Sequence, residues 1–437
     1  MNLDSYWNNL WTDYGGTQLQ NFAAHCHANG QKAAIYFGPF VYWGTATDAT
    51  NYWVPVGFPP NYSLYRFSDI LLRDANGNFI SNDGAYAVDP THPGARGLID
   101  YYVYWFTNWG FDYVKLDFLS HGSLEGLHYD PSVTTGIQAY NQGMQYLRGK
   151  LGSKMFISES IAPIFPYQYA HSRRIACDAQ QSKISNIAYT MNGVSLGWWI
   201  SGRLYQFNDP DLMVFDNGPN SNENQSRFIN GAVTGVFLNG SILTNSASVS
   251  LAQTCLTNVA INAVARVGKT FRSVDGATGT GAADILSRQD GKNWNTAVFN
   301  YNSSSANQTV SLDSAGLPAG IFVATNLLDG TTATVSNSLS VSLNAKQAKL
   351  FRLALVSAPP LPKFVASAPA GGNNFTFSGG NGIPGWAYSV LASRNLALPV
   401  SQWPVVATNL FDADGNFSFT NGPGLNAPRQ FYLLKLQ

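Results

Sequence analysis

The N-terminal part of the chain alternates short apolar runs with segments in which apolar residues recur at helical spacing. The segment 17–30 has this spacing and ends in a glycine suited to cap a helix. The segment 91–110 adds Thr91 as N-cap, Pro93 in the first turn and a final glycine. The apolar run 111–118 follows at once. A helix that leads directly into a buried strand is typical of parallel strands joined by crossover helices.

Seven apolar runs before residue 250 are strand candidates. They are NLDSYW, KAAIYFG, FDYVKLDF, KMFISES, RRIACDA, LMVFDN and SILTNS. The best fit is a (β/α)₈ (TIM) barrel in which one strand is missing, and the first strand is the candidate.

The pattern changes after about Lys269, where apolar residues recur at every second position in short runs separated by turn residues. This predicts an antiparallel β-sandwich. A Pro/Ala-rich linker and a small all-β domain follow. The predicted domains are a barrel over 1–268, a sandwich over 269–355, and the linker with the small β domain over 356–437.

The run FDYVKLDF carries charge where burial is expected. Side chains alternate along a strand, so Lys115 and Asp117 share one face with Tyr113, while Val114, Leu116 and Phe118 share the other. If the apolar face packs under the helices, Lys115 and Asp117 point into the barrel. Asp117 comes last, at the strand end where barrel enzymes keep their chemistry. A buried structural ion pair is the alternative.

A second run, RRIACDA, repeats this pattern, because alternation places Arg174, Ala176 and Asp178 on one face. Two carboxylates on different strand ends that face one cavity are what glycoside hydrolysis requires. The alternative here is a structural bridge between Arg174 and Asp178. In the third cluster, FNDPDLMVF, Asp209 and Asp211 flank a proline, and this pattern alone indicates only a turn.

The composition narrows the function classes. Charged residues make up 11% of the chain and the formal net charge is zero, so no basic field is available for nucleic acid or anionic membranes. No apolar run reaches about 18 residues, so we expect no membrane span. Abundant Trp and Tyr suit stacking on sugar rings or other flat ligands.

Three widely spaced cysteines indicate neither a disulfide framework nor a metal motif, and we expect no cofactor and no metal. The N-terminal residues lack a charged start followed by an apolar core, so the chain carries no signal peptide. Its uncharged surface, rich in Asn, Ser, Thr and Gly, nevertheless favours a secreted protein with an extracellular or periplasmic location.

Four motifs, in their order and spacing, resemble the α-galactosidase group of glycoside hydrolases, families 27 and 36. They are DPTHPGAR, WGFDYVKLDF, RRIACDA and FNDPDLMV. The predicted sandwich, with NLLDG and its final AKLFRLAL, is similar to the C-terminal β domain of family 27. The resemblance covers about residues 1–355.

The resemblance implies roles for five residues. Asp117 is implied as the nucleophile, and Lys115 as a contact of sugar hydroxyls. Asp178 is implied as the general acid/base, with Arg174 as a substrate contact. Asp211 is implied to line the sugar site.

The resemblance implies three further substrate contacts, at positions where the sequence matches the family less closely. Tyr36 fits a tyrosine at the end of the family's third strand, and Asp4 fits the first of two consecutive acids, the second being Ser5 here. Glu159 falls in the loop that reads the substituent on sugar carbon two, and a local structural role is equally open. The family's first strand has no counterpart before Met1, so either the chain starts late or the barrel closes differently.

The expected function is that of a retaining exo-glycosidase that cleaves a terminal α-linked sugar, with galactose the first choice, from an oligosaccharide or polysaccharide. The two carboxyl groups should lie about 5 to 6 Å apart. Lys115 should help to keep Asp117 ionised, and a dry setting should raise the pKa of Asp178. β-L-arabinopyranosides and α-N-acetylgalactosaminides are further candidate substrates. A non-catalytic carbohydrate-binding or adhesion protein on a degenerate barrel is the alternative from another class.

Overall fold

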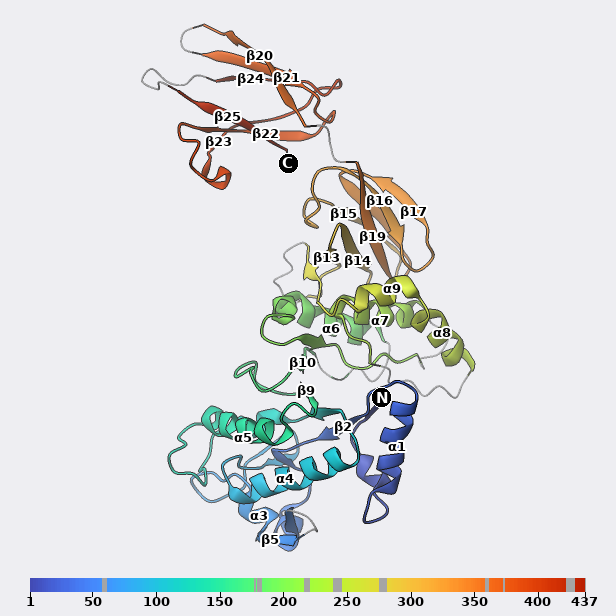
Figure 1. The fold of residues 1–437 in the computed structure, drawn as a ribbon, viewed down its shortest axis with the longest axis vertical. Coiled ribbons are helices and arrows are strands. Elements are labelled where there is room, and N and C mark those ends of the chain that lie inside the picture. The colour runs from blue at the N-terminus through green and yellow to red at the C-terminus, as the bar shows by residue number, and fades with distance from the viewer. Residues whose placement is uncertain are drawn as a thin grey trace. The chain divides into compact units, whose positions relative to one another are not determined.

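The computed structural model describes most of the chain, in two compact units, Met1–Ala283 and Asp284–Gln437 (Figure 1). The described residues are 1–56, 61–176, 178, 183–215, 221–238, 246–274, 281–357, 361–371, 374–421 and 429–436. The three predicted domain ranges remain predictions.

The first unit is built on a parallel sheet of six strands in the order β1-β2-β8-β9-β10-β11. The strands are β1 (Asn2–Leu3), β2 (Ala34–Phe37), β8 (Tyr113–Leu116), β9 (Phe156–Glu159), β10 (Ser172–Arg174) and β11 (Phe207–Asp209). Sequential parallel strands joined by helices match the predicted barrel pattern. The described residues do not include strands that close this sheet into eight, so barrel closure remains a prediction.

The prediction of a strand in LMVFDN is wrong for its described part, 212–215. The strand is Phe207–Asp209, five residues earlier, and it pairs with β10. Pro210 has no N–H to donate to the ladder, and Asp211 has a positive φ of 68°, so the chain turns directly after Asp209. The candidate run SILTNS lies outside the described residues except for its last residue, which begins a helix.

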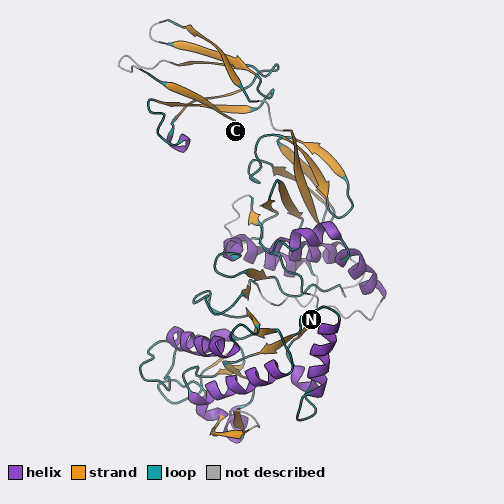
Figure 2. Cartoon of the chain, viewed as in Figure 1, coloured by secondary structure: helices purple, strands orange, loops and turns teal. Residues whose placement is uncertain are grey.

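Helices and short 3₁₀ turns separate the strands, as Figure 2 shows. They are η1 (Trp7–Leu10), α1 (Thr17–Ala28), α2 (Ala46–Asn51), α3 (Phe67–Ile70), α4 (Pro93–Asn108), η2 (Leu119–Ser123), α5 (Gly136–Leu151), α6 (Ile184–Gly197), η3 (Trp198–Ile200), α7 (Ser221–Thr234), α8 (Ser246–Leu256) and α9 (Val259–Ala265). Two small antiparallel sheets, β3-β7-β6 and β4-β5, also belong to this unit. Their strands are β3 (Val41–Tyr42), β4 (Trp53–Val56), β5 (Asn61–Arg66), β6 (Ser81–Asn82) and β7 (Ala85–Ala87). A further short strand, β12 (Arg272–Ser273), comes near the end of the unit.

The two predicted helices, α1 and α4, are confirmed. Gly30 and Gly110 follow their ends with φ of 69° and 87°, the left-handed conformation that glycine adopts without steric cost. The predicted N-cap of α4 is wrong by one residue. His92 is the cap, because its Nδ1 accepts the N–H of Gly94, whereas the Thr91 hydroxyl donates to Asp89.

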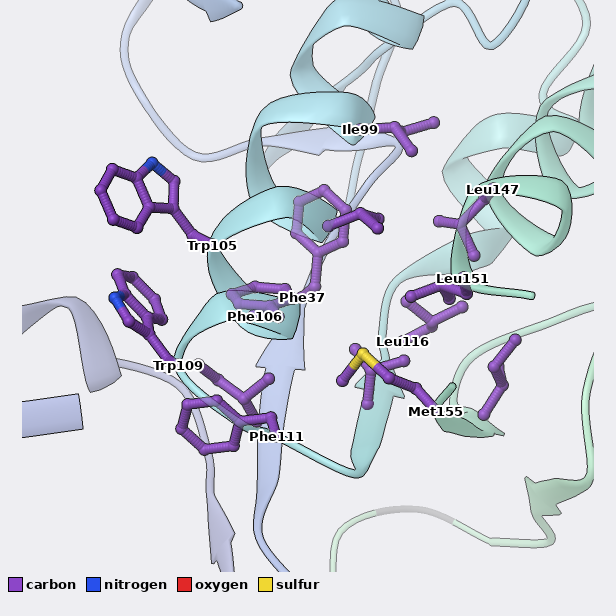
Figure 3. Close-up of a cluster of buried hydrophobic side chains, with 14 of the residues drawn as sticks. Phe37, Ile99, Trp105, Phe106, Trp109, Phe111, Leu116, Leu147, Leu151 and Met155 are labelled. Carbon is purple, nitrogen blue, oxygen red and sulfur yellow. The ribbon is translucent and has the colours of Figure 1, made fainter. Parts of the chain in front are cut away.

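The predicted apolar face of β8 is confirmed as the face under the helices for Val114 and Leu116, but it is wrong for Phe118, which lies beyond the strand with a φ of 54°. Val114 and Leu116 are buried in one cluster with side chains of α4 and α5. Figure 3 shows Phe37 of β2 and Leu116 beside Phe106 and Leu147 of these helices. Because the helices cover this face, the alternate residues of β2 and β8 point to the inner side of the sheet.

The second unit contains the predicted antiparallel strands. Its first sheet runs β13-β14-β19-β16-β17, with β15 and β18 paired separately. The bounds are β13 (Ile285–Asp290), β14 (Asn293–Phe299), β15 (Ala306–Ser311), β16 (Ile321–Asn326), β17 (Thr332–Val335), β18 (Ser338–Leu343) and β19 (Ala348–Ser357).

The last segment forms two three-stranded sheets, β20-β21-β24 and β23-β22-β25. The bounds are β20 (Lys363–Pro369), β21 (Phe375–Gly380), β22 (Ala387–Ser393), β23 (Val405–Leu410), β24 (Phe417–Asn421) and β25 (Phe431–Leu436), with η4 (Val400–Gln402) between β22 and β23. Trp386 and Trp403 are buried, and Trp386 packs with Tyr388 and Phe417 in the core of this segment. Across the described parts of both units, no helix combines the length and the apolar character needed to cross a membrane.

Candidate active site

The strand registers place a row of polar side chains on the inner face of the parallel sheet. Tyr36 pairs with Lys115, and Lys115 pairs with Ser158 on β9. Ser158 in turn pairs with Ser172, two residues before Arg174 on β10. Asp117 likewise comes two residues after Lys115, so Asp117 and Arg174 lie at the same level near the carboxyl ends of their strands. This is the end at which barrel enzymes bind substrates.

Lys115 and two acids form the first cluster, which we call the lysine cluster: Asp4, Lys115 and Asp117. The Lys115 ammonium lies 2.9 Å from Asp4 Oδ2 and 3.6 Å from Asp117 Oδ2. Burial alone would lower the pKa of Lys115, but the two carboxylates outweigh burial, so its pKa is raised. The ammonium therefore stays charged. Asp117 is buried, with one oxygen accepting the N–H of Phe118.

Tyr36 lies beside this cluster. The Lys115 ammonium is 5.5 Å from the centre of the Tyr36 ring. Burial raises the pKa of the Tyr36 hydroxyl, and three nearby carboxylates raise it further. They belong to Asp117, Asp4 and Asp178. The hydroxyl therefore remains a neutral donor in a negatively charged setting.

Arg174 organises the second cluster, which we call the arginine cluster: Arg174, Asp178, Asp209 and Asp211. Its Nη2 donates to Asp178 Oδ1 at 2.6 Å, and its Nη1 lies 3.3 Å from Asp211 Oδ1 without hydrogen-bond geometry. The guanidinium is buried. Burial alone would lower the pKa of Arg174, but the surrounding carboxylates outweigh burial and raise it. Arg174 is thus a permanent cation between acids.

The prediction that Asp178 ends a strand is wrong. β10 stops at Arg174, and the Arg174 guanidinium donates to the Ala176 carbonyl and pairs with Asp178, four residues on. The Asp178 side chain is 63% exposed, so the dry setting expected for it is absent. Asp178 nevertheless faces the inner side, because its carboxylate is held by Arg174.

Two buried charged residues in this region were not recognised from the sequence as parts of the site. Asp209 ends β11 beside Arg174, accepts the N–H of Asp211 and the Ser158 hydroxyl, and has its pKa raised by burial against the opposing charge of Arg174. Arg227 of α7 donates to the carbonyls of Pro210 and Leu212, so it fixes the turn that carries Asp211. Burial lowers the pKa of Arg227 to about 10. The sequence signal that could have indicated Arg227 is its position as the single basic residue of α7.

The two clusters converge. Asp117 of the lysine cluster and Asp178 of the arginine cluster both act on the Tyr36 hydroxyl, and the charge of Arg174 opposes protonation of Lys115. The strand registers place both clusters on the inner face of one sheet. The lysine cluster joins Asp4, Lys115 and Asp117 with Tyr36 beside it, and the arginine cluster joins Arg174, Asp178 and Asp211.

A hollow of about 1080 Å³ opens beside the arginine cluster. Arg174 and Asp178 line it, together with Ile161 and Pro163 of the loop after β9 and Tyr189 of α6. Asp117 is not among the lining residues, so the hollow extends from the side of Asp178. It has room for more than one sugar unit.

Glu159 is not brought to this site. It pairs in register with Leu116 and Arg173, so it shares the face that the helices cover. Glu159 is fully buried there, and its Oε2 lies 3.1 Å from the Tyr205 hydroxyl. Glu159 therefore lies on the face away from the two clusters, because the alternation of β9 sends Ser158, not Glu159, to the inner face.

Within the described residues, no group of three His, Cys, Asp or Glu side chains is arranged to hold a metal ion. The assembled groups are carboxylates, cations and a phenol. Such a set can form a covalent ester, transfer protons and donate hydrogen bonds to hydroxyl groups.

No family model matches the sequence. No curated protein matches it either.

Several solved structures are similar. One is a variant of a GH27 β-L-arabinopyranosidase from Geobacillus stearothermophilus in complex with arabinose, with 18% identity over 80% of each chain and a TM-score of 0.59. Another is the isomalto-dextranase of Arthrobacter globiformis complexed with panose, with 16% identity over 100% of this chain and 88% of that one and a TM-score of 0.58. A candidate α-galactosidase from Bacteroides fragilis has 15% identity over 82% and 71% and a TM-score of 0.51. These similarities show that the chain has the α-galactosidase-like fold of glycoside hydrolase family 27.

Proposed function

We propose that the protein is a retaining exo-glycosidase acting on a terminal α-linked sugar. The observation that carries the proposal is a pair of carboxylates near the carboxyl ends of parallel strands, Asp117 beside the partly buried Lys115 and Asp178 beside the buried Arg174. The similar solved structures support a carbohydrate substrate, since their names describe glycosidases.

In this mechanism Asp117 attacks the anomeric carbon while Asp178 gives a proton to the leaving oxygen. A glycosyl ester on Asp117 results. Asp178 then takes a proton from water, which attacks the same carbon and releases the sugar with its configuration retained. Before Asp178 can protonate the substrate, its ion pair with Arg174 must open. The Asp178 carboxylate is exposed, so the substrate can reach it. Lys115, Asp4 and Tyr36 would bind sugar hydroxyls, with Asp211 closing the opposite side.

Galactose is the first choice for the terminal sugar, following the resemblance of the motifs. A second candidate is a terminal unit of an α-linked glucan. It is favoured by the similarity to the isomalto-dextranase, which covers the whole of this chain including its last β segment. It is also favoured by Ser5, which replaces a carboxylate that the resemblance associates with sugar hydroxyls.

Purified protein incubated with a panel of substrates tests the proposal. The panel holds nitrophenyl α-galactoside, β-L-arabinopyranoside and α-N-acetylgalactosaminide, and dextran with reducing sugar as the readout. We expect hydrolysis of at least one member, with the α-galactoside first. No turnover of any member, together with retention of the protein on immobilised polysaccharide, would instead favour the non-catalytic alternative.

Asp178→Asn is expected to separate substrates by their leaving groups. With a sugar or alkyl leaving group, kcat/KM should fall by about 10²–10⁴-fold, because the departing oxygen needs a proton. With a dinitrophenyl leaving group the first step should be nearly unaffected, because that oxygen departs as a stable anion. Burst kinetics on both substrates measure this difference. An equal loss on both would mean that Asp178 acts through the structure and not as an acid.

A further inference from the structure

The segment 160–168 after β9 forms one wall of the hollow beside Asp178, through Ile161, Ala162 and Pro163. Three of its carbonyls are held by donors from other elements. The Ser120 N–H donates to Ile161, Arg173 donates to Ala162 at 3.1 Å, and the Tyr205 hydroxyl donates to Ile164 at 3.1 Å. Ile161 has a φ of 46°, which is strained for a β-branched residue, so the wall depends on these anchors.

The Tyr205 hydroxyl has one proton but two possible acceptors. The Tyr205 hydroxyl also lies 3.1 Å from Glu159 Oε2, and both side chains are buried from water. A phenol carries one proton and can fully donate to only one of two acceptors. If Glu159 were ionised, it would compete with the Ile164 carbonyl for that proton. If Glu159 is a neutral acid, it donates to the phenol oxygen, and the phenol proton remains free for Ile164.

We propose that Glu159 is a positioning residue which, as a neutral acid, completes a hydrogen-bond relay from its carboxyl group through the Tyr205 hydroxyl to the Ile164 carbonyl, and so fixes the wall of the hollow. Ionisation of Glu159 would divert the Tyr205 proton to the carboxylate and release Ile164. The wall would then loosen as the pH rises.

The groups around Glu159 agree with a neutral acid. Burial raises the pKa of Glu159 to about 8, against the opposing effects of Tyr205, Arg173 and Tyr140. Arg173 of β10 forms no ion pair with Glu159 within 4.0 Å and uses its Nη2 on Ala162. Tyr140 of α5 lies near enough to Glu159 to oppose the rise of its pKa, yet neither the Tyr140 hydroxyl nor Glu159 Oε1 has a partner in hydrogen-bond geometry. Near neutral pH the carboxyl group therefore keeps its proton.

Amide hydrogen exchange of segment 160–168 between pH 6 and pH 9.5, corrected for intrinsic exchange, tests the relay. In the unmodified protein, protection should fall by about fivefold across this range, the equivalent of one hydrogen bond. In Glu159→Gln it should stay high at every pH, because the amide donates to Tyr205 and never ionises. In Tyr205→Phe it should be low at every pH. Exchange in α4 reports on unfolding of the whole unit.

Glu125→Gln is the matched control, since it makes the same change at a carboxylate that accepts the Gly136 N–H instead. Its exchange should follow the unmodified protein. The relay is wrong if Glu159→Gln loses protection with pH as the unmodified protein does, or if the unmodified protein shows no fall. If Tyr205→Phe fails to fold, the Glu159→Gln comparison decides alone.

This inference rests on the proposed function only in treating the hollow as the leaving-group side. Exchange needs no substrate, so the relay can be confirmed even if the protein hydrolyses none. If it is a glycosidase, kcat/KM for a disaccharide should decline above about pH 8 in the unmodified protein and decline less in Glu159→Gln. An identical decline in both would remove the link between the wall and turnover.

Discussion

Asp117→Asn is expected to abolish turnover, with kcat lower by a factor on the order of 10⁵. The amide cannot form the glycosyl ester, and among the described residues the only other carboxylate within 4.0 Å of the Lys115 ammonium is Asp4, at 2.9 Å. The measurement is release of nitrophenol from the best substrate of the panel, at high enzyme concentration.

The fold should survive this change. Asparagine keeps the oxygen that accepts the Phe118 N–H, and Lys115 keeps its partner Asp4. Asp112→Asn is the matched control, because Asp112 precedes the same strand and pairs with Lys32 and His27 at the opposite end. It should leave kcat unchanged. If Asp117→Asn keeps more than about a hundredth of the original kcat, Asp117 is not the nucleophile.

Arg174→Met is expected to lower the free energy of unfolding of the first unit by about 3 to 5 kcal/mol. The change removes the guanidinium from between the buried carboxyl groups of Asp209 and Asp211. Burying like charges without their cation is costly. Arg227 cannot take its place, since its donors hold two backbone carbonyls and Asn230.

Urea unfolding followed by tryptophan fluorescence measures this loss. Arg203→Met serves as the control, because Arg203 is exposed and the same substitution there should change stability by less than about 0.5 kcal/mol. A loss below about 1 kcal/mol for Arg174→Met would show that the acids do not depend on the guanidinium. The predicted loss should shrink at low pH, where Asp209 is protonated first because its pKa is raised.

The inner face of β8 could be predicted from alternation alone. Val114 and Leu116 are apolar on one side, and Lys115 and Asp117 are polar on the other, so the helices could cover only one face. Helix ends were also predictable where a glycine must adopt a positive φ, as at Gly110. In both cases the local sequence allows only one low-energy arrangement, which is the orientation of the strand for β8 and the left-handed backbone conformation for Gly110.

Asp178 shows where alternation fails. The same rule assumed that the strand continues to residue 178, but the ladder ends at Arg174, and a contact between residues four apart decides where Asp178 lies. The alternative prediction of a bridge between Arg174 and Asp178 describes this contact, whereas the predicted length of the strand does not. The role predicted for Asp178 therefore has a different structural basis from the one expected.

Glu159 shows that a shift of one residue along a strand changes the face of the sheet on which a side chain lies. Ser158 and Glu159 are adjacent, and only the register against Lys115 and Leu116 decides which of them reaches the inner side. Register is set by neighbouring strands distant in sequence. For the same reason Asp209 was taken as part of a turn, although β10 pairs with it.

Trapping of a covalent intermediate tests the central claim most directly. The protein is incubated with a fluorinated glycosyl fluoride of the sugar that the panel selects, which forms the glycosyl ester quickly and hydrolyses it slowly, and its peptides are then analysed by mass spectrometry. We expect one added glycosyl mass, on the peptide that contains Asp117, and none in Asp117→Asn. A label on any other carboxylate, or steady turnover that never gives a labelled peptide, would contradict that claim.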